Sequence, residues 1–246
     1  NSIKLSYSRM FQYMHLVSSS TVALPTDLWY PVSKNVKPQR SDQVALGWSG
    51  FLSGIGAQYT IETYYKWMNN LIEYKEGSNL ILNDNFESIL LQGKGESYGL
   101  EVMLRRMEGK FNGWLAYNLG YSQRFFDELN GGAPFWSKYD RRHTFSAVMN
   151  YEITPRIVFS AIWEYISGSR FTPLVANYIY PDPSLSSIEL LPVYTKRNAQ
   201  VLSPSHRLDV NIIFKSRRTR KFKYEFHIGA YNAYNRAMPY RINVDI

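Results

Sequence analysis

The sequence predicts an all-β protein, a transmembrane antiparallel up-and-down β-barrel, of which this chain forms a fragment of about nine strands. Three observations support this prediction. Apolar and polar side chains alternate with a period of two over long stretches, as in residues 111–125, and this period belongs to strands with two unlike faces. Those stretches exceed the roughly 5–6 residues of an ordinary soluble strand and reach the about 9–11 that a tilted membrane strand needs. The connections alternate between short and long, as they do in outer-membrane barrels.

The stretch 111–125 shows the pattern most clearly. Its odd positions are mostly apolar, and its even positions are mostly small or polar. Aromatic residues stand near both ends of the apolar set, at Phe111, Tyr121 and Phe125, where a membrane barrel carries its aromatic girdles. In chain order, the other strands predicted by the same alternation cover residues 2–8, 43–49, 57–67, 97–105, 144–151, 157–165, 207–215 and 222–231.

The connections fall into two groups that take turns along the chain. The short group covers residues 52–56, 108–110, 152–155 and 216–221. The long group covers residues 10–40, 69–93, 126–138 and 168–205. Outer-membrane barrels place short turns on the periplasmic side and long loops on the extracellular side. A soluble sandwich or propeller has no reason to sort its loops in this way, although the periodicity alone leaves open a soluble barrel with a dry core.

Composition agrees with a membrane barrel and excludes a membrane helix. Of the 246 residues, 16% are aromatic, and many of the 20 tyrosines fall within the alternating stretches, as amphipathic rings at a membrane interface do. No run of about 18 apolar residues occurs, so a membrane helix is excluded. The mean hydropathy of −0.33 is compatible with a barrel, because lumen-facing side chains are polar. The chain has no cysteine, hence no disulfide and no thiolate metal site.

Charge and chain ends add two expectations. The formal net charge is +8, and the one dense basic cluster covers residues 215–223. Because this cluster lies between two predicted strands, we expect a solvated turn there and no nucleic-acid partner. The chain opens directly in a strand pattern, with no signal peptide before it, and it ends without a closing signal. We therefore expect a piece of a longer protein.

The residues show no pattern typical of an enzyme. The four histidines are not at metal-ligand spacing, and no GxSxG motif occurs. The glycines of residues 93–99 precede a predicted strand and not a helix, so they mark a loop-to-strand junction better than a phosphate loop. Residues 139–143 (YDRRH) offer either a catalytic Asp–His pair or an Arg–carboxylate anchor for a loop, and the anchor fits a strand start better. We expect no enzymatic activity, no cofactor and no metal ion. The histidines are His15, His143, His206 and His227.

Several segments resemble the C-terminal part of the β-barrel domain of TonB-dependent outer-membrane receptors. Their order and spacing carry the resemblance, which covers nearly the whole chain. The segments are NVKPQRSDQVALGW (35–48), GKGESYGLEVMLRR (93–106), GWLAYNLGYSQR (113–124), FWSKYDRRHTFSAVMNY (135–151), HRLDVNIIF (206–214) and HIGAYNAYNR (227–236).

The resemblance implies a barrel of about 22 strands around a plug, of which residues 1–246 form a partial domain. It places the plug domain, the signal peptide and the last barrel strand outside this chain. It also implies a location in the outer membrane of a Gram-negative bacterium. The implied partners are outer-membrane lipid, the TonB energy-coupling complex through the absent plug region, a surface lipoprotein, and a small-molecule or oligomeric nutrient.

Two sets of residues are candidates for function. Aromatic residues in the long loops suit stacking on a sugar, a peptide or the catechols of a siderophore, and the alternative is that they pack the loops together or lie at the membrane interface. These residues are Trp29, Tyr30, Phe135, Trp136, Tyr178 and Tyr180. Polar residues on the opposite strand face are expected to point into the lumen, where they contact the plug or line the path of the nutrient. These are Glu101, Arg105, Asn118, Arg124, Glu164 and Asp209.

The function expected from pattern and resemblance together is active, TonB-dependent uptake of a scarce nutrient such as a siderophore, a glycan or a peptide. The loops capture the nutrient, and it then passes through the plugged barrel. One alternative is a passive porin or a structural barrel of a surface complex. A second alternative is a soluble all-β carbohydrate-binding module. The sequence does not name the ligand, because specificity resides in variable loops and in the absent plug.

Overall fold

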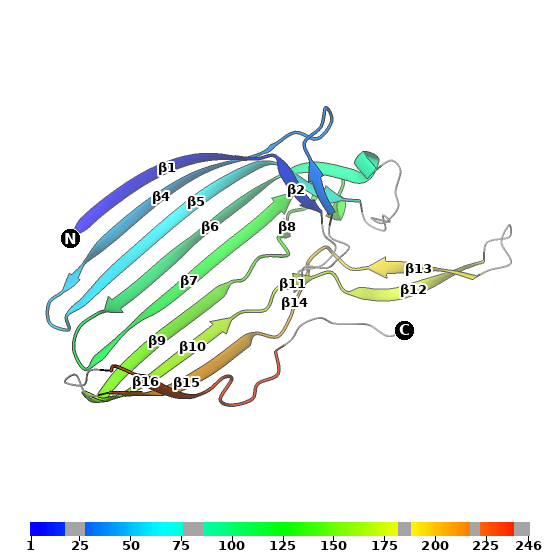
Figure 1. Ribbon diagram of the computed structural model, residues 1–246. Coiled ribbons are helices and arrows are strands. Elements are labelled where there is room, and N and C mark those ends of the chain that lie inside the picture. Colours follow the sequence, from blue (N-terminus) through cyan, green and yellow to red (C-terminus); the bar gives the residue numbers. More distant parts are fainter. Residues whose placement is uncertain (18–27, 76–85, 182–187, 217–221, 239–246) are drawn as a thin grey trace.

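The computed structural model describes residues 1–17, 28–75, 86–181, 188–216 and 222–238. Nearly all of its regular structure lies in one antiparallel sheet of tilted, gently curved strands (Figure 1). Each strand pairs with the next long strand along the chain. The path runs through β1 (Ser2–Gln12), β4 (Gln39–Leu52), β5 (Ala57–Tyr74), β6 (Leu90–Arg106), β7 (Phe111–Phe125), β9 (His143–Thr154), β10 (Ile157–Ile166), β15 (Ser205–Lys215) and β16 (Glu225–Ala230). This meander confirms the predicted up-and-down topology.

Each predicted strand corresponds to a strand on this path, but several strands begin or end farther toward the long connections, and β16 is shorter than the predicted strand 222–231. β4 begins at Gln39 instead of residue 43, β5 continues to Tyr74 instead of residue 67, and β6 begins at Leu90 instead of residue 97. Hydrogen bonding between strands continues there after the alternation of apolar and polar side chains has stopped. A period-two search therefore finds only the portion of each strand that has one apolar face.

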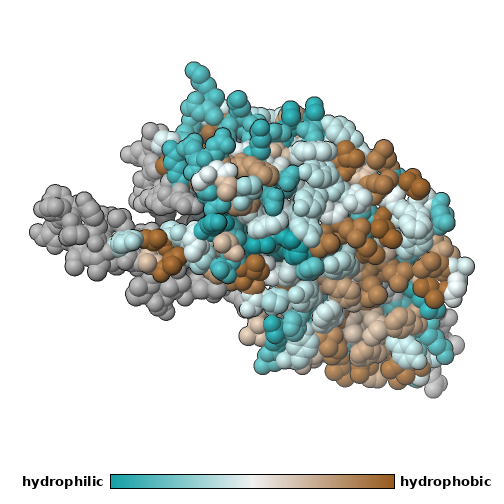
Figure 2. All heavy atoms as spheres, turned by 180° about the vertical axis from the view of Figure 1, so that it is seen from behind, coloured by the Kyte–Doolittle hydropathy of each residue, from teal (hydrophilic) through white to brown (hydrophobic). Residues whose placement is uncertain are grey.

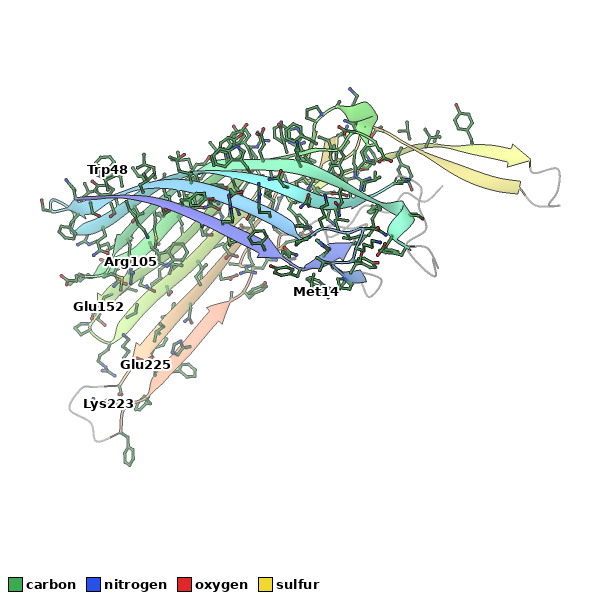
Figure 3. All side chains as sticks on the ribbon, turned by 90° about the horizontal axis from the view of Figure 1, so that it is seen from above. Met14, Trp48, Arg105, Glu152, Lys223 and Glu225 are labelled. Carbon is green, nitrogen blue, oxygen red and sulfur yellow. The ribbon has the colours of Figure 1, made fainter. Side chains whose placement is uncertain are left out.

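The long connections gather at one end of the sheet and the short turns at the other (Figure 1). In Figure 3, Met14 lies at the long-connection end, whereas Trp48, Arg105 and Glu152 lie toward the short-turn end. The turn predicted at 216–221 falls mostly outside the described residues.

The long connections contain several small elements. These are the hairpin β2 (Met14–Val17) and β3 (Leu28–Pro31), the 3-10 turns η1 (Phe86–Ile89) and η2 (Asn130–Gly132), the short strand β8 (Phe135–Trp136) beside β7, the pair β11 (Arg170–Phe171) and β14 (Gln200–Val201), and the projecting hairpin β12 (Leu174–Pro181) and β13 (Ile188–Tyr194).

The sheet has two unlike faces, which we call the outer face and the inner face. Side chains alternate between them along each strand, and directly paired residues share a face. The outer face carries most of the exposed large apolar side chains, whereas small and polar residues dominate the inner face. Figure 2 shows hydrophobic residues gathered over the strands toward their short-turn ends. The exposed large apolar residues that the register places on the outer face include Ile3, Leu5, Leu46, Trp48, Leu115, Tyr151, Ile212, Phe214, Phe226 and Ile228.

The buried apolar residues form two small clusters at the long-connection end. One contains Leu71, Leu91, Phe126, Leu129 and Phe135. The other contains Val17, Val36 and Ile72, with partly buried neighbours that include Tyr30 and Phe86. Among the described residues, neither cluster covers the apolar outer face of the sheet. An apolar face that is left exposed is the arrangement of a membrane barrel, and it disagrees with the alternative of a soluble barrel with a dry core. Within the part of the chain that the structure describes, no helix is long and apolar enough to cross a membrane.

Candidate functional site

A buried ion-pair network fixes the longest connection, residues 168–205, to the inner face of the sheet. Glu73 accepts hydrogen bonds from Arg124 on β7 and from Arg197, whose Nη2 lies 2.6 Å from a Glu73 carboxylate oxygen. All three side chains are largely buried. Arg197 belongs to the segment between β13 and β14, so the network joins the base of the projecting hairpin to β5 and β7. Breaking such a pair from one side is costly, because the other charge stays buried without a partner.

A β-bulge turns Glu73 toward this network. β5 inserts Asn70 as an extra residue between Asn69, which pairs with Lys94, and Leu71, which pairs with Gly93. Asn70 has a φ of 57°, and asparagine tolerates this left-handed conformation better than most residues. Its side-chain amide donates a hydrogen bond of 2.9 Å to the carbonyl oxygen of Pro38. The bulge shifts the alternation by one residue, so that Leu71 and Glu73 face inward.

A second anchor is centred on Asp140, whose side chain is almost fully buried. Arg170 and Arg142 donate to its Oδ2 over 2.7 Å and 3.2 Å, and the backbone N–H of Ser122 donates to its Oδ1 over 2.9 Å. Residues 139–143 therefore hold an Arg–carboxylate loop anchor. His143 does not join Asp140; its Nδ1 lies 2.8 Å from the hydroxyl of Tyr117. Of the two interpretations of the YDRRH motif, the anchor matches these contacts.

Asn198 completes the base of the longest connection. It is buried and has a φ of 52°. Its side-chain amide donates to the carbonyl oxygen of Trp136 over 2.8 Å, and its backbone N–H donates to the hydroxyl of Thr172 over 3.0 Å. Arg170, Arg197 and Asn198 thus hold this segment at three points, close to where it leaves and rejoins the sheet. The hairpin β12–β13 extends beyond this base (Figure 1).

The structure separates the six aromatic candidates into different environments. Trp29 on β3 and Tyr178 on β12 are 57% and 68% exposed. Tyr30 packs against Phe86 with ring centroids 5.4 Å apart, and its hydroxyl donates to Glu87 over 2.6 Å. A ligand-binding role stays a prediction for all six residues. Exposure favours this role for Trp29 and Tyr178, and packing disfavours it for Tyr30.

The remaining aromatic candidates do not join Trp29 and Tyr178. Phe135 is only 4% exposed and belongs to a buried cluster. Trp136 lies on the outer face, opposite Gln123, and the guanidinium groups of Arg142 and Arg170 lie 4.6 Å and 4.9 Å from its ring centroid. Tyr180 lies in β12, but its side chain is outside the described residues. The six residues therefore do not form one cluster.

The register places all six polar candidates on the inner face. Glu101 and Asn118 are directly paired, and their side chains approach to 3.5 Å. Arg207 contacts both Glu164 and Asp209, over 3.1 Å and 3.0 Å. The other two are Arg105, which pairs with Gln58, and Arg124, which contacts Glu73. Whether these residues contact a plug or line a path for the nutrient stays a prediction.

Among the members of these networks that sequence reasoning missed are Glu73, Arg197 and Arg207. Glu73 and Arg197 lie in stretches predicted to be irregular loops, and they are 124 residues apart. Arg207 lies in a predicted strand, where its position opposite Glu164 follows only once the register is known. The alternation could have placed Arg207 on the inner face, because it is two residues from Asp209. No local pattern marks the other two.

Two titratable groups in the long connections are shifted by their surroundings. Hydrogen bonds from Ser33, Tyr30 and Asn35 hold the pKa of the Glu87 carboxyl below its ordinary value. Burial lowers the pKa of the His15 imidazole, which lies on β2 with its Nδ1 3.0 Å from the side-chain amide of Gln39. Both groups help to hold the β2–β3 hairpin. Within the described ranges, no group of three or more His, Asp or Glu side chains is arranged to hold a metal ion.

Comparison with known proteins identifies the family. The model of the "TonB dependent receptor-like, beta-barrel" family matches residues 2–233. A similar solved structure is the closed form of the ferric-catecholate import receptor Fiu from Escherichia coli K12, with a TM-score of 0.58 and 14% sequence identity. The similarity covers 95% of this chain and 29% of the Fiu chain, so this chain spans less than a third of that receptor. At this identity the likeness concerns the fold. A search of curated proteins finds no match.

The family match extends over nearly the whole chain and agrees with the meander, the sorted loops and the exposed apolar face. Barrels of this family lie in the outer membrane of Gram-negative bacteria, and the family consists of transport receptors and not of enzymes. In barrels of this kind the apolar face meets lipid and the polar face lines the lumen, and we expect the same of the outer and inner faces here. The chain belongs to the TonB-dependent receptor family, within its β-barrel domain.

Proposed function

We propose that this chain is the later part of the barrel of an outer-membrane receptor that imports a scarce nutrient with energy delivered through TonB. The observation that carries the proposal is the clamping of the longest loop to the inner face through Arg197, Glu73 and Arg124. When a ligand binds to the loop above the barrel, these ion pairs can transmit the change to the strands of the barrel wall.

The proposed mechanism has three steps. The nutrient first contacts the exposed tips of the long connections, where Trp29 and Tyr178 offer aromatic surface. The plug, which lies outside this chain, then rearranges when TonB delivers energy from the inner membrane. The nutrient finally passes along the inner face, where Glu101, Asn118 and Arg207 provide hydrogen-bonding groups.

The substrate class that we propose is a ligand with flat, polarisable groups, such as a siderophore, a glycan or a peptide. Exposed aromatic rings stack on such groups. Fiu is a ferric-catecholate import receptor, and catechol rings belong to this class. The likeness to Fiu supports testing ferric catecholates first, with an oligosaccharide and a peptide for comparison.

The test uses the full-length receptor in a host that lacks its own copy. Uptake of a labelled ferric catecholate, an oligosaccharide and a peptide is measured in the presence and absence of TonB. Accumulation of one ligand that stops when TonB is deleted supports the proposal. Diffusive entry of small solutes that does not depend on TonB overturns it in favour of a porin. A barrel that carries none of these solutes but co-purifies with other surface proteins overturns it in favour of a structural role.

A further inference from the structure

An apolar row crosses the otherwise polar inner face near its short-turn end. Trp114 on β7 pairs with Val148 on β9, and Val148 pairs with Ile162 on β10. Ile162 is 38% exposed, and Met103, which lies near this row on β6, is 37% exposed. The two buried apolar clusters lie at the opposite end of the sheet, so neither covers this row. Apolar side chains that face a lumen indicate a contact with something that enters it.

A cationic side chain adjoins the indole ring of Trp114. Arg105 pairs directly with Trp114, so the two side chains share the inner face. Arg105 is exposed, and its Nε donates over 2.8 Å to the sulfur of Met107, which is a weak acceptor. Figure 3 shows Arg105 toward the short-turn end of the sheet. An indole ring offers a flat apolar surface and a guanidinium group binds oxyanions, so the pair suits a flat ligand that carries negative charge.

A row of polar side chains follows the apolar row toward the short turns. Asn112 pairs with Asn150, and the amide nitrogen of Asn150 donates to the side-chain oxygen of Asn112 over 3.2 Å. Ser160 continues the row between Asn150 and Asn211. The two rows are about 7 Å apart, because two residues of a strand rise by about that distance. Amide and hydroxyl groups donate and accept hydrogen bonds, so they can bind the oxygen atoms of a ligand whose ring lies on the apolar row.

The charges at the short-turn end of the sheet are mostly positive. The turns adjoin one another there, since the backbone N–H of Glu152 donates to the carbonyl oxygen of Lys110 over 2.7 Å, and that of Lys215 donates to the carbonyl oxygen of Arg156 over 2.7 Å. An excess of cations attracts an anion toward this end of the lumen. The described cations of these turns and of the strand ends beside them include Arg105, Lys110, Arg156, Lys215 and Lys223, and the carboxylates include Glu108, Glu152 and Glu225.

An acidic pair lies farther from the short turns. Glu62 pairs directly with Glu101 on the inner face. Glu101 lies on the same strand as Arg105, about 13 Å nearer to the loops. An anion that has reached Arg105 is therefore hindered by the two carboxylates from returning toward the loops. Movement in the other direction is driven by TonB in the proposed mechanism.

We propose that Trp114, Arg105 and Asn112 form a late binding site for an aromatic ligand that carries negative charge, such as a metal catecholate. The indole stacks on the ring of the ligand, the guanidinium group binds its anionic oxygen atoms, and the amide donates a further hydrogen bond. This inference rests on the proposed function and narrows its substrate class, because a neutral oligosaccharide would not use the cation. The plug would cover these side chains until it rearranges, so the ligand meets them after it has left the loops.

The test uses the full-length receptor in a host that lacks its own copy. The site variants are Trp114→Leu and Arg105→Gln, and the conservative variants are Trp114→Phe and Arg105→Lys. The matched controls are Phe111→Leu and Arg106→Gln, because both residues lie at the same end of the sheet on its outer face. Equal gel mobility of unboiled samples shows that the barrels fold. Surface binding of a ferric catecholate is measured without TonB, and its uptake rate is measured with TonB.

We expect Trp114→Leu and Arg105→Gln to lower the maximal rate of ferric catecholate uptake by about fivefold or more, the effect of losing one stacking contact or one charge-assisted hydrogen bond. The ligand concentration that half-saturates surface binding should stay unchanged, since the site lies inside the barrel. The conservative variants should recover most of the rate, and the outer-face controls should keep it. An unchanged rate in both site variants overturns the inference.

Further outcomes separate the ligand from another occupant and from the proposed function. Faster hydrogen exchange of the plug amides in resting Trp114→Leu and Arg105→Gln receptors would show that these residues hold the plug, and it overturns the ligand site. TonB-dependent uptake of a neutral oligosaccharide without uptake of the ferric catecholate overturns the negative charge of the ligand but leaves the proposed function in place. If no ligand is taken up in a TonB-dependent way, the proposed function itself is overturned, and this site with it.

Discussion

Arg197 donates a hydrogen bond of 2.6 Å to Glu73 across 124 residues of sequence. This contact brings the base of the longest loop against the strand that bears the β-bulge. Because Arg124 contacts the same carboxylate, Glu73 is a branch point between two strands of the wall and one loop. Its position explains how the base of this loop is fixed to the barrel.

Replacing Arg197 by methionine should loosen the loop base. Glu73 would lose one of its two charged partners inside a largely buried network but keep Arg124, so the loss should stay below the about 3–5 kcal/mol that a buried charge without any partner costs. Hydrogen exchange should show the amides of β11 and β14 losing protection while those of β9 and β10 keep theirs. The control is Lys75→Gln, since Lys75 pairs with Glu128 at 3.9 Å on the exposed surface, where a pair contributes about 0–1 kcal/mol. Equal effects of the two substitutions would show that the network does not hold the loop.

Leu115→Arg should lower the free energy of unfolding by about 2–4 kcal/mol, the cost of a charged side chain on the lipid face near the membrane centre. Asn118→Arg should cost much less, because Asn118 shares the inner face with Glu101. Urea titration of the receptor folded into vesicles measures both values. Similar losses for the two variants would contradict the assignment of the faces.

Trp29→Ala and Tyr178→Ala should each raise the ligand concentration needed for half-maximal uptake, since both rings are exposed and available for stacking. Their effect on the amount of folded barrel should be small. Phe135→Leu is the comparison, because Phe135 is buried and its replacement should change stability before it changes affinity. Unchanged uptake in Trp29→Ala and Tyr178→Ala would show that these two exposed residues have no role in ligand binding.

Acidification should release the β2–β3 hairpin in two stages. Burial lowers the pKa of His15 in the folded state, so the hairpin loses stability as the pH falls below the ordinary value of 6.5, where the unfolded form takes up the proton first. The pKa of Glu87 is also lowered by its hydrogen bonds. Its contribution is therefore present above the ordinary value of 4.5 and is lost as the pH falls below it.

Limited proteolysis of the β2–β3 connection between about pH 7 and pH 3.5 follows both stages, because cleavage needs local opening. His15→Phe should remove the stage at higher pH, and Glu87→Gln should remove the stage at lower pH. A cleavage profile that is the same in wild type and both variants would show that neither group controls the hairpin.

Much of the fold follows from the sequence because lipid imposes a pattern that a strand must obey along its whole crossing. The alternation in residues 111–125 predicts β7 with the bounds that the structure has, since both ends of this strand coincide with turns. β5 is different. Its last residues continue beyond the alternating stretch, where Leu71 and Ile72 are buried in two loop clusters on opposite faces, so the period-two pattern gives no information there. The bulge at Asn70 then shifts the alternation by one residue.

The candidate site is less predictable than the sheet. The inner-face positions of Glu101 and Asn118 follow from alternation alone. The partnership of Glu73 with Arg197 does not, because it depends on the path of a loop through space. Phe135 and Trp136 are adjacent in sequence, yet one is buried in a cluster and the other lies under two guanidinium groups. An aromatic residue in a loop therefore indicates an interaction, but the sequence does not say whether its partner is a ligand or the protein itself.

The clamped base of the hairpin β12–β13 has a mechanical consequence. The hairpin projects from the short strand pair β11–β14, which would act as the pivot of its motion. In this pair Arg170 lies opposite Val201 and Phe171 lies opposite Gln200. A displacement of the exposed arm at Tyr178 would load the contacts of Arg170 with Asp140 and of Arg197 with Glu73. Force applied outside the cell would thus reach β5 and β7 through two arginine side chains.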